Sequence, residues 1–194
     1  MRLAIMADSH DNLANLKKTL VYLNRQGIKL IIHCGDIASD ETLEKMVKFF
    51  PGNIYFTFGN ADNIPLAKIK NSPCTKPKVL VQGQKSPKES DLKSDPTGQA
   101  KLNFCNKFGE IEIDNKKIAF THFPSQAKKL AKKGKYDLVF YGHTHKPWIQ
   151  QISNLRKSTL LVNPGNLCGV FYKPSFAVYD TEKQGLSLIR LDLI

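Results

Sequence analysis

The sequence has few cysteines and no closely spaced pair among them. Cys34, Cys74, Cys105 and Cys168 form no C-x-x-C motif, so neither a zinc knuckle nor a disulfide framework is indicated, and a reducing compartment fits best. Long apolar runs are also missing. No stretch approaches the roughly 18 residues that a membrane span needs, and the apolar run in "MRLAIMADSH" is too short for a signal peptide. We therefore expect a soluble cytoplasmic protein.

Acidic residues are scarce relative to basic ones. There are 17 Asp and Glu against 29 Lys and Arg, a formal net charge of +12. This balance favours an anionic partner, such as a phosphorylated small molecule, nucleic acid or a membrane surface. Five lysines between Lys128 and Lys135 fall on the outer side of a short amphipathic helix, with no aromatic residue among them to stack bases. We interpret them as a solvated helix face; nucleic acid is not excluded as a partner, and no membrane partner is expected.

The remaining composition is that of a globular protein. The chain has 194 residues, of which 41% are hydrophobic and 24% charged, and this length favours a single domain over residues 1–194. Residues 83–101 depart from this pattern, because they are rich in Ser, Lys, Pro and Gly and lack hydrophobic periodicity. We expect a flexible insertion there, either a tolerated surface loop or a lid or partner-docking segment.

The N-terminal third has a β-α-β-α-β pattern. The runs "RLAIMAD", "KLIIHCGD" and "NIYFTFGNAD" are typical of buried strands that end in polar residues. Between them, one helix follows Asn12 as its N-cap and stops at Gly27, and another begins at Ser39 or Asp40 and closes at Pro51. Strands connected by helices predict an α/β fold with a parallel sheet.

The second half of the chain is richer in strands. "GEIEIDNKKIAFTHF" predicts two strands joined through Asp114 and Asn115, and a short helix is predicted from Ser125 to Lys133. "YDLVFYGHTH" then predicts another buried strand. Four mostly antiparallel strands are predicted near residues 148 to 152, 158 to 162, 175 to 180 and 186 to 193.

Polar residues recur where these strands end. They are Asp8-Ser9-His10, Gly35-Asp36, Gly59-Asn60-Ala61-Asp62, Thr121-His122 and Gly142-His143-Thr144-His145. A D-x-H or H-x-H motif alone is more often a turn with a surface histidine. Here, however, four of the five histidines join strand-end acids and an amide at one edge of the sheet, which is where open α/β sheets bind ligands. We therefore predict a metal site at this edge.

Seven residues are candidate metal ligands, which is too many for one ion. They are Asp8, His10, Asp36, Asn60, His122, His143 and His145. Imidazole and carboxylate donors suit Mn, Fe, Ni, Co or Zn. Residues i and i+2 of an extended segment point the same way, so we expect His10 to join Asp8 and His145 to join His143. Two ions about 3.5 to 4 Å apart need a shared carboxylate, for which Asp36 is the candidate, and the glycines before Asp36, Asn60 and His143 leave room for close approach.

The motifs "DSH", "GD", "GN", "TH" and "GHTH", in this order, resemble those of the calcineurin-like metallophosphoesterase superfamily. Within it, the chain most resembles the small bacterial and archaeal phosphodiesterase group often called the YfcE or MJ0936-like family. The motifs span residues 8 to 145, and "NPGN" at 163 to 166 resembles the N-P-G-S segment of that family. The resemblance implies a four-layer α-β-β-α sandwich, in which two mixed β-sheets are flanked by helices, and it favours a homodimer.

The resemblance also implies a reaction. Two divalent metal ions are expected, manganese first, with Fe, Ni, Zn or Co as alternatives. One ion would be held by Asp8, His10, Asp36 and His145, and the other by Asp36, Asn60, His122 and His143. A metal-bridging hydroxide would attack a phosphate ester in line, most readily a diester, with Asp8, Asp36, Asn60 and His122 as catalytic residues. The alternative function is that of a non-catalytic interaction scaffold, as in a retromer subunit that resembles this fold.

The chain departs from the family pattern at two positions. Ala61 stands where larger relatives have His and the small family commonly has Cys, so we expect no protein general acid there and a bias toward esters with good leaving groups. Thr121 replaces the Gly of a "GH" motif, and we expect His122 to keep its ligand role. Two further residues stay open: His33 is either a satisfied buried histidine or orients a ligand or loop, and Asp62 either acts near the site or only caps backbone groups.

Overall fold

The computed structural model describes residues 1–65, 100–155 and 157–194. Residues 83–99 of the predicted insertion therefore lie outside the described residues, as does Cys74. The predicted C-terminal end of the insertion is wrong, because Lys101 is already the first residue of a strand. Of the three cysteines within the described residues, Cys34 and Cys105 are buried and Cys168 is half-buried.

The first sheet has six strands in the order β11-β10-β1-β2-β3-β4. Their bounds are β1 (Arg2–Met6), β2 (Leu30–His33), β3 (Asn53–Thr57), β4 (Lys101–Cys105), β10 (Ser175–Asp180) and β11 (Gly185–Arg190). Strands β1 to β4 are parallel neighbours, whereas β10 runs antiparallel to both β1 and β11. The parallel sheet predicted from the N-terminal third is thus confirmed, and it carries an antiparallel edge.

The second sheet has five strands in the order β5-β6-β7-β9-β8. Their bounds are β5 (Phe108–Ile113), β6 (Lys116–Thr121), β7 (Leu138–Phe140), β8 (Trp148–Ser153) and β9 (Ser158–Asn163). Strands β6, β7 and β9 are parallel, and β5 and β8 pair antiparallel at the two edges. The predicted hairpin turn at Asp114 and Asn115 has φ values of 48° and 60°, which are the left-handed conformations that a two-residue type I′ turn requires.

Within the described residues, three α-helices flank the sheets. They are α1 (Leu13–Arg25), α2 (Asp40–Phe49) and α3 (Pro124–Lys132). The side chain of Asn12 accepts the N–H of Asn15 at 3.0 Å, and that of Ser39 caps α2 in the same way, so both predicted N-caps are confirmed. Helix α3 begins one residue earlier than expected, because Pro124 occupies its first position, where the missing N–H would be unsatisfied anyway.

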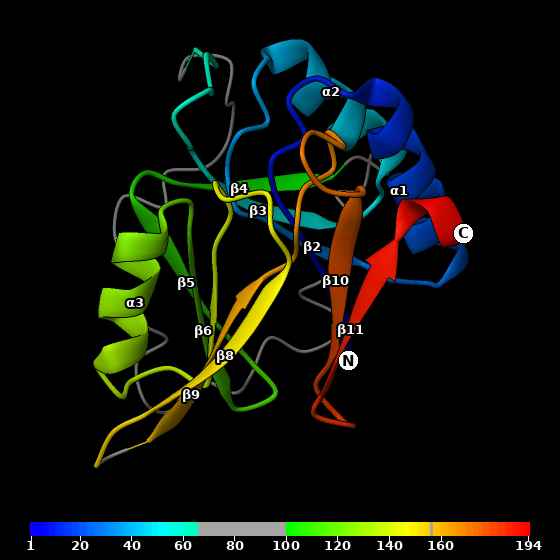
Figure 1. Cartoon of the computed structure of the whole chain (residues 1–194). Helices are drawn as coiled ribbons and strands as arrows, with labels where there is room; N and C mark the ends of the chain where they lie inside the picture. The colour runs from blue at the N-terminus through cyan, green and yellow to red at the C-terminus, as the bar shows by residue number, and fades with distance from the viewer. Residues whose placement is uncertain (66–99, 156) are drawn as a thin grey trace.

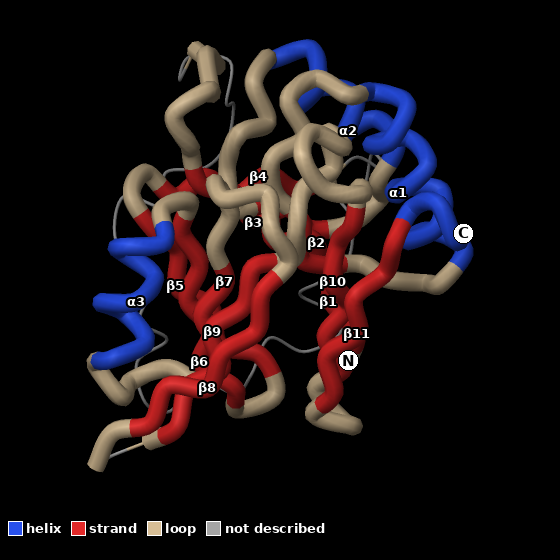
Figure 2. Tube along the Cα trace, in the orientation of Figure 1, coloured by secondary structure: helices blue, strands red, loops and turns tan. Residues whose placement is uncertain are grey.

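The layers follow from three apolar clusters. One lies between the first sheet and helices α1 and α2 and includes Leu16, Met46 and Phe56. A second joins the two sheets face to face, with Ile5 of β1 and Phe120 of β6 among its members. The third packs α3 on the outer face of the second sheet. The order is therefore helix, sheet, sheet, helix, with α3 on one side and α1 and α2 on the other (Figures 1 and 2), which confirms the predicted four-layer fold.

Two elements differ from the sequence-based prediction. Strand β4 was not predicted, because "KLNFC" is mostly half-buried, lacks clean alternation and is specified by its pairing with β3. The last predicted strand, 186 to 193, ends at Arg190 and continues as a 3-10 turn, η3 (Leu191–Leu193). No helix among the described residues is long and apolar enough to span a membrane.

Candidate metal centre

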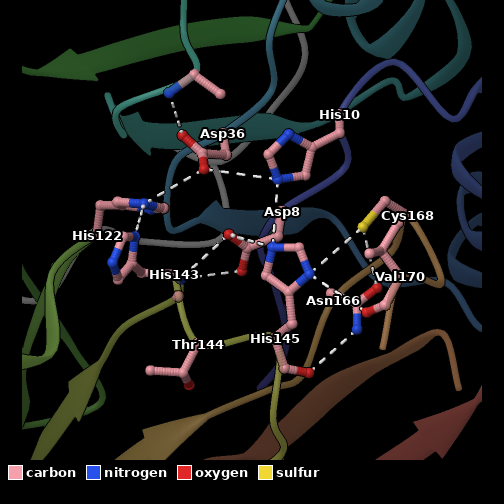
Figure 3. A network of polar contacts seen from close by, with 12 residues as sticks. Asp8, His10, Asp36, His122, His143, Thr144, His145, Asn166, Cys168 and Val170 are labelled. Atoms are coloured by element: carbon pink, nitrogen blue, oxygen red, sulfur yellow. Dashed lines mark hydrogen bonds and ion pairs between the residues drawn. The ribbon is translucent and has the colours of Figure 1, made fainter. Parts of the chain in front are cut away.

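The predicted ligands lie at strand ends of both sheets. Asp8 follows β1, Asp36 follows β2 and Asn60 follows β3 of the first sheet. His122 follows β6, and the segment with His143 and His145 follows β7, of the second sheet. Because β1 to β3 are parallel to one another, as are β6 and β7, these ends meet at one edge of the sandwich. Figure 3 shows the resulting group of carboxylates and imidazoles.

The first half of the group contains His10, His145 and Asp8. The Nε2 atoms of His10 and His145 face each other at 3.3 Å, and His145 Nε2 lies 3.6 Å from Asp8 Oδ1. Both Asp8 oxygens also accept the backbone N–H of His143 at 3.1 Å. Three side-chain donors from two chain segments, the loop after β1 and the loop after β7, thus point at a common centre (Figure 3).

The second half contains Asn60, His122 and His143. Asn60 Oδ1 lies 3.1 Å from His122 Nε2 and 2.9 Å from His143 Nδ1, and these two ring nitrogens are 3.2 Å apart. Asp36 lies between the two halves, since its Oδ2 is 3.5 Å from His10 Nε2 and 3.4 Å from His122 Nε2. All seven predicted ligands are therefore brought together.

The burial and the pKa shifts of the candidate ligands indicate which kind of ion they fit. Asp8 is fully buried and Asp36 is 2% exposed. Burial, reinforced by the neighbouring Asp36 carboxylate, raises the pKa of Asp8 to about 8, while burial lowers the pKa of His122 and of His145. Buried anions beside neutral imidazoles are costly unless a cation compensates them. Carboxylate, amide and neutral imidazole donors at this spacing fit divalent metal ions.

The backbone at the ligands is strained. Five of the seven have a positive φ: Asp8 (53°), His10 (41°), Asp36 (57°), His143 (71°) and His145 (58°). The extended geometry expected for the D-x-H and H-x-H motifs is therefore wrong. As a result, His143 and His145 face different halves of the group, rather than a common centre. Left-handed non-glycine residues concentrate at functional sites, where the surrounding structure holds them in place.

The three glycines that precede ligands have no room for a side chain. A Cβ on Gly59 would lie 2.1 Å from Asp36 Oδ1, and one on Gly142 would lie 2.9 Å from Asp8 Oδ2. On Gly35, which has φ of 92°, a Cβ would meet His122 Nδ1 at 2.8 Å. The sequence-based expectation of close approach at these glycines is confirmed.

Two supporting residues lie behind the group. The carboxylate of Asp62 accepts three backbone N–H groups, from Asp36 at 2.9 Å, Ala38 at 2.8 Å and Gly59 at 2.7 Å, so it ties the loop after β2 to the loop after β3. His33 is fully buried, with its Nε2 3.2 Å from Ser9 Oγ. Burial lowers the pKa of His33 to about 4, and its Nδ1 has no hydrogen-bond partner among the described residues.

No sequence pattern predicted the contacts of the segment 166–170 with His145. The His145 ring turns its Nδ1 toward the Val170 carbonyl at 3.4 Å and toward Cys168 Sγ at 3.7 Å. Asn166 donates from Nδ2 to the His145 carbonyl at 3.0 Å. The "NPGN" turn marks this loop, but no spacing connects it to the histidines. His10, His145 and Cys168 also offer ligand atoms that lie within 4.8 Å of one another.

The fold and the site place the chain among the metal-dependent phosphoesterases. The sequence matches the calcineurin-like phosphoesterase superfamily domain over residues 1–184, and the chain belongs to this superfamily. It is 29% identical over 187 residues to phosphodiesterase MJ0936 from Methanocaldococcus jannaschii, covering 95% of each protein. The family resemblance inferred from the motifs is thus confirmed.

Solved structures agree with this assignment. An archaeal phosphodiesterase superposes with a TM-score of 0.73 at 28% identity, covering 98% of this chain and 99% of the other. Two more distant proteins share the fold. YfcE, a phosphoesterase from E. coli, has a TM-score of 0.57 at 15% identity, covering 98% of this chain and all of YfcE (100%). Zinc-complexed Vps29 from Entamoeba histolytica has a TM-score of 0.60 at 15% identity, covering 98% and 99%.

Proposed function

We propose that this protein is a phosphodiesterase that hydrolyses phosphorylated small molecules with two divalent metal ions. The observation that carries the proposal is the position of Asp36. Its Oδ2 lies 3.5 Å from a nitrogen of His10 in one half of the group and 3.4 Å from a nitrogen of His122 in the other. A carboxylate shared by two ions needs such a place between two sets of donors. Similarity to phosphodiesterase MJ0936 supports a diester as the substrate.

The donors divide naturally into two sets. One ion would be held by Asp8, His10, Asp36 and His145, and the other by Asp36, Asn60, His122 and His143. Nitrogen donors mixed with oxygen donors suit manganese, our first expectation, as well as iron, nickel, zinc or cobalt. When bound, the two ions supply Lewis acidity, which lowers the pKa of water for in-line attack and offsets charge on the phosphoryl oxygens.

The chain itself orients the donors. With Nδ1 protonated, His122 donates to the Cys34 carbonyl at 2.9 Å, which leaves the Nε2 lone pair directed at the site. In the same way, with Nδ1 protonated, His145 donates to the Val170 carbonyl at 3.4 Å, which leaves its Nε2 lone pair directed at the site. Backbone acceptors of this kind fix the tautomer and the ring plane of a metal-binding histidine. In our proposal, Asp62 binds no metal itself. It positions the ligands by accepting the backbone N–H groups of Asp36 and Gly59.

Ala61 sets a limit on leaving-group chemistry. Its N–H donates to Asp36 Oδ1 at 2.8 Å, so the backbone at this position orients the shared carboxylate. Its methyl side chain cannot donate a proton. We therefore infer that the leaving oxygen departs without a general acid from position 61, and that esters with acidic leaving groups react fastest.

The test is hydrolysis of aryl phosphodiesters with added manganese, across leaving groups of different pKa. We expect activity that chelator removes, and rates that fall as the pKa of the leaving group rises. Asp36→Ala and His143→Ala should each lose at least about 100-fold in kcat/KM, because even partners that only support metal ligands are worth 10- to 100-fold. Lys45→Ala, which breaks only a surface pair with Glu41, is the matched control and should stay near wild type.

Metal analysis combined with activity assays distinguishes this function from the alternative, a non-catalytic interaction scaffold. Wild-type protein should bind two equivalents of manganese and turn over. Protein that binds metal but hydrolyses neither diesters nor monoesters would instead favour the interaction scaffold. Rates that do not depend on leaving-group pKa would contradict the role given to Ala61.

A further inference from the structure

Two exposed aromatic rings lie beside the metal centre, one next to each half of the donor group. Phe123 is 39% exposed, and its ring centroid lies 4.9 Å from that of His122 and 5.3 Å from that of His143. Phe171 is 88% exposed and lies 6.1 Å from the ring of His145. Each half of the donor group therefore has its own neighbouring phenyl ring. A single exposed apolar side chain is common on a protein surface. Two phenyl rings beside one polar donor group instead form apolar surface next to a site, and apolar surface of that kind marks ligand binding.

Phe123 is placed by rigid structure. It directly follows His122, occupies the N-cap position of α3 with φ of −85° and ψ of 133°, and precedes Pro124. Its ring stands nearly perpendicular to that of His122, at 83°. One side of the ring is thus set against the imidazoles, and the remainder faces solvent.

Phe171 is held out by a strained loop. Its φ is 66°, which a side chain of this size rarely adopts. The backbone on both sides is fixed: Val170 O faces His145 Nδ1 at 3.4 Å, and the Tyr172 carbonyl accepts from Asn166 Nδ2 at 3.5 Å. The same Asn166 amide donates to the His145 carbonyl, so the loop is coupled to a ligand of the site. Backbone strain that presents an exposed ring is typical of functional positions.

We propose that Phe171 is a specificity-determining residue, which stacks on a planar aromatic substituent of the phosphodiester, such as a nucleobase, while Phe123 provides apolar surface beside the other half of the donor group. This inference rests on the proposed function, because it assumes that the phosphate binds at the metal centre. A diester carries two organic groups on its phosphorus, and one phenyl ring lies next to each half of the donor group. Phe171 is assigned the stacking role because its ring is almost fully exposed, and stacking needs a free face.

The experiment compares two esters that share one leaving group. Thymidine 5′-(4-nitrophenyl) phosphate and methyl 4-nitrophenyl phosphate both release nitrophenolate, so they differ only in the group that stays. Phe171→Ala should lower kcat/KM for the nucleoside ester about 10-fold, mainly through KM, since a base stacked on an aromatic ring contributes about this much or more. The methyl ester should change less than about twofold. Phe171→Leu should behave like Phe171→Ala, and Phe171→Tyr should restore the preference.

Phe49→Ala is the matched control, because Phe49 is a 43% exposed phenylalanine at the far end of α2. A binding measurement keeps the inference testable if turnover fails. Calorimetry with thymidine 5′-monophosphate and methyl phosphate on manganese-loaded protein should show the same selective loss in Phe171→Ala. Hydrolysis of neither ester by wild type would contradict the proposed function alone. An equal loss of affinity for both ligands in Phe171→Ala would overturn the stacking role.

Discussion

At the scale of single residues, the site depends on the absence of a side chain at Gly59. A Cβ at position 59 would lie 2.1 Å from Asp36 Oδ1 and 2.7 Å from His122 Cε1. Gly59→Ala must therefore displace the carboxylate that faces both halves of the group. We expect at least about a 100-fold loss of phosphodiesterase activity, a lower affinity for manganese, and destabilisation of about 1 to 3 kcal/mol from overpacking.

Gly185→Ala is the control for this substitution, because the nearest atom to its Cβ is 4.0 Å away. Calorimetric titration with manganese and urea unfolding measure the two effects separately. If Gly59→Ala bound manganese as wild type does, the close packing around Asp36 would not matter for the site.

His33 predicts a pH dependence of folding stability. Burial lowers its pKa to about 4 from an ordinary value of 6.5. Below pH 6.5 the unfolded chain takes up a proton that the folded protein excludes, so stability falls as the pH falls from 6.5 toward 4. By pH 5 the loss from this residue is about 2 kcal/mol.

The comparison is between wild type and His33→Gln, both free of metal, in urea unfolding at pH 7 and pH 5. The other four histidines are present in both proteins, so the difference between the two pH slopes isolates His33. Equal slopes would show that His33 is protonated as readily in the folded protein as in the unfolded chain.

At the scale of elements, the hairpin between β5 and β6 depends on left-handed residues. Asn115 has φ of 60° in its turn, where a β-branched side chain is strained by about 1 to 2 kcal/mol. We expect Asn115→Val to lose this much unfolding free energy and Asn115→Gly to stay within about 0.5 kcal/mol of wild type. Thermal unfolding of the pair provides the measurement, and equal stability of the two variants would exclude a strained turn.

Elements with local signals were predictable, and those set by distant pairing were not. The bounds of helix α1 were predictable because Asn12 and Gly27 mark its two ends within one short segment. Strand β4 was not, since its place depends on β3, more than 40 residues earlier in the chain. The contact of the 166–170 loop with His145 was missed for the same reason: Cys168 N–H donates to the Asp8 carbonyl at 2.9 Å, and pairing of β10 with β1 brings these segments together.

The ligand list is a separate case. Residue types at strand ends sufficed to name the seven donors, because parallel strands deliver their carboxyl ends to one edge. Which donor meets which was not deducible from spacing. The left-handed conformations at His143 and His145 turn the two rings toward different halves of the group. The family resemblance implied this division, whereas the spacing of the H-x-H motif predicted a common centre.

At the scale of the whole molecule, the metal centre joins the two sheets. Asp8, Asp36 and Asn60 come from the six-stranded sheet, and His122, His143 and His145 from the five-stranded sheet. Ions bound there would contact segments of both sheets, and they would bind the folded state far better than the unfolded one. Their contribution to stability then follows mass action, about 2.7 kcal/mol at a free metal concentration 100 times Kd.

We therefore expect manganese to raise the Tm of chelator-treated protein by about 5 to 10 °C at that concentration, given the size of the chain. Asp36→Asn should abolish this shift, because it removes the carboxylate that faces both donor sets. The metal-free variant should be at least as stable as metal-free wild type, since it removes one of two buried carboxylates, and Asp36 is a cause of the raised pKa of Asp8. Scanning calorimetry with and without manganese gives all four values. A shift of equal size in wild type and Asp36→Asn would mean that manganese stabilises the protein from somewhere other than this centre.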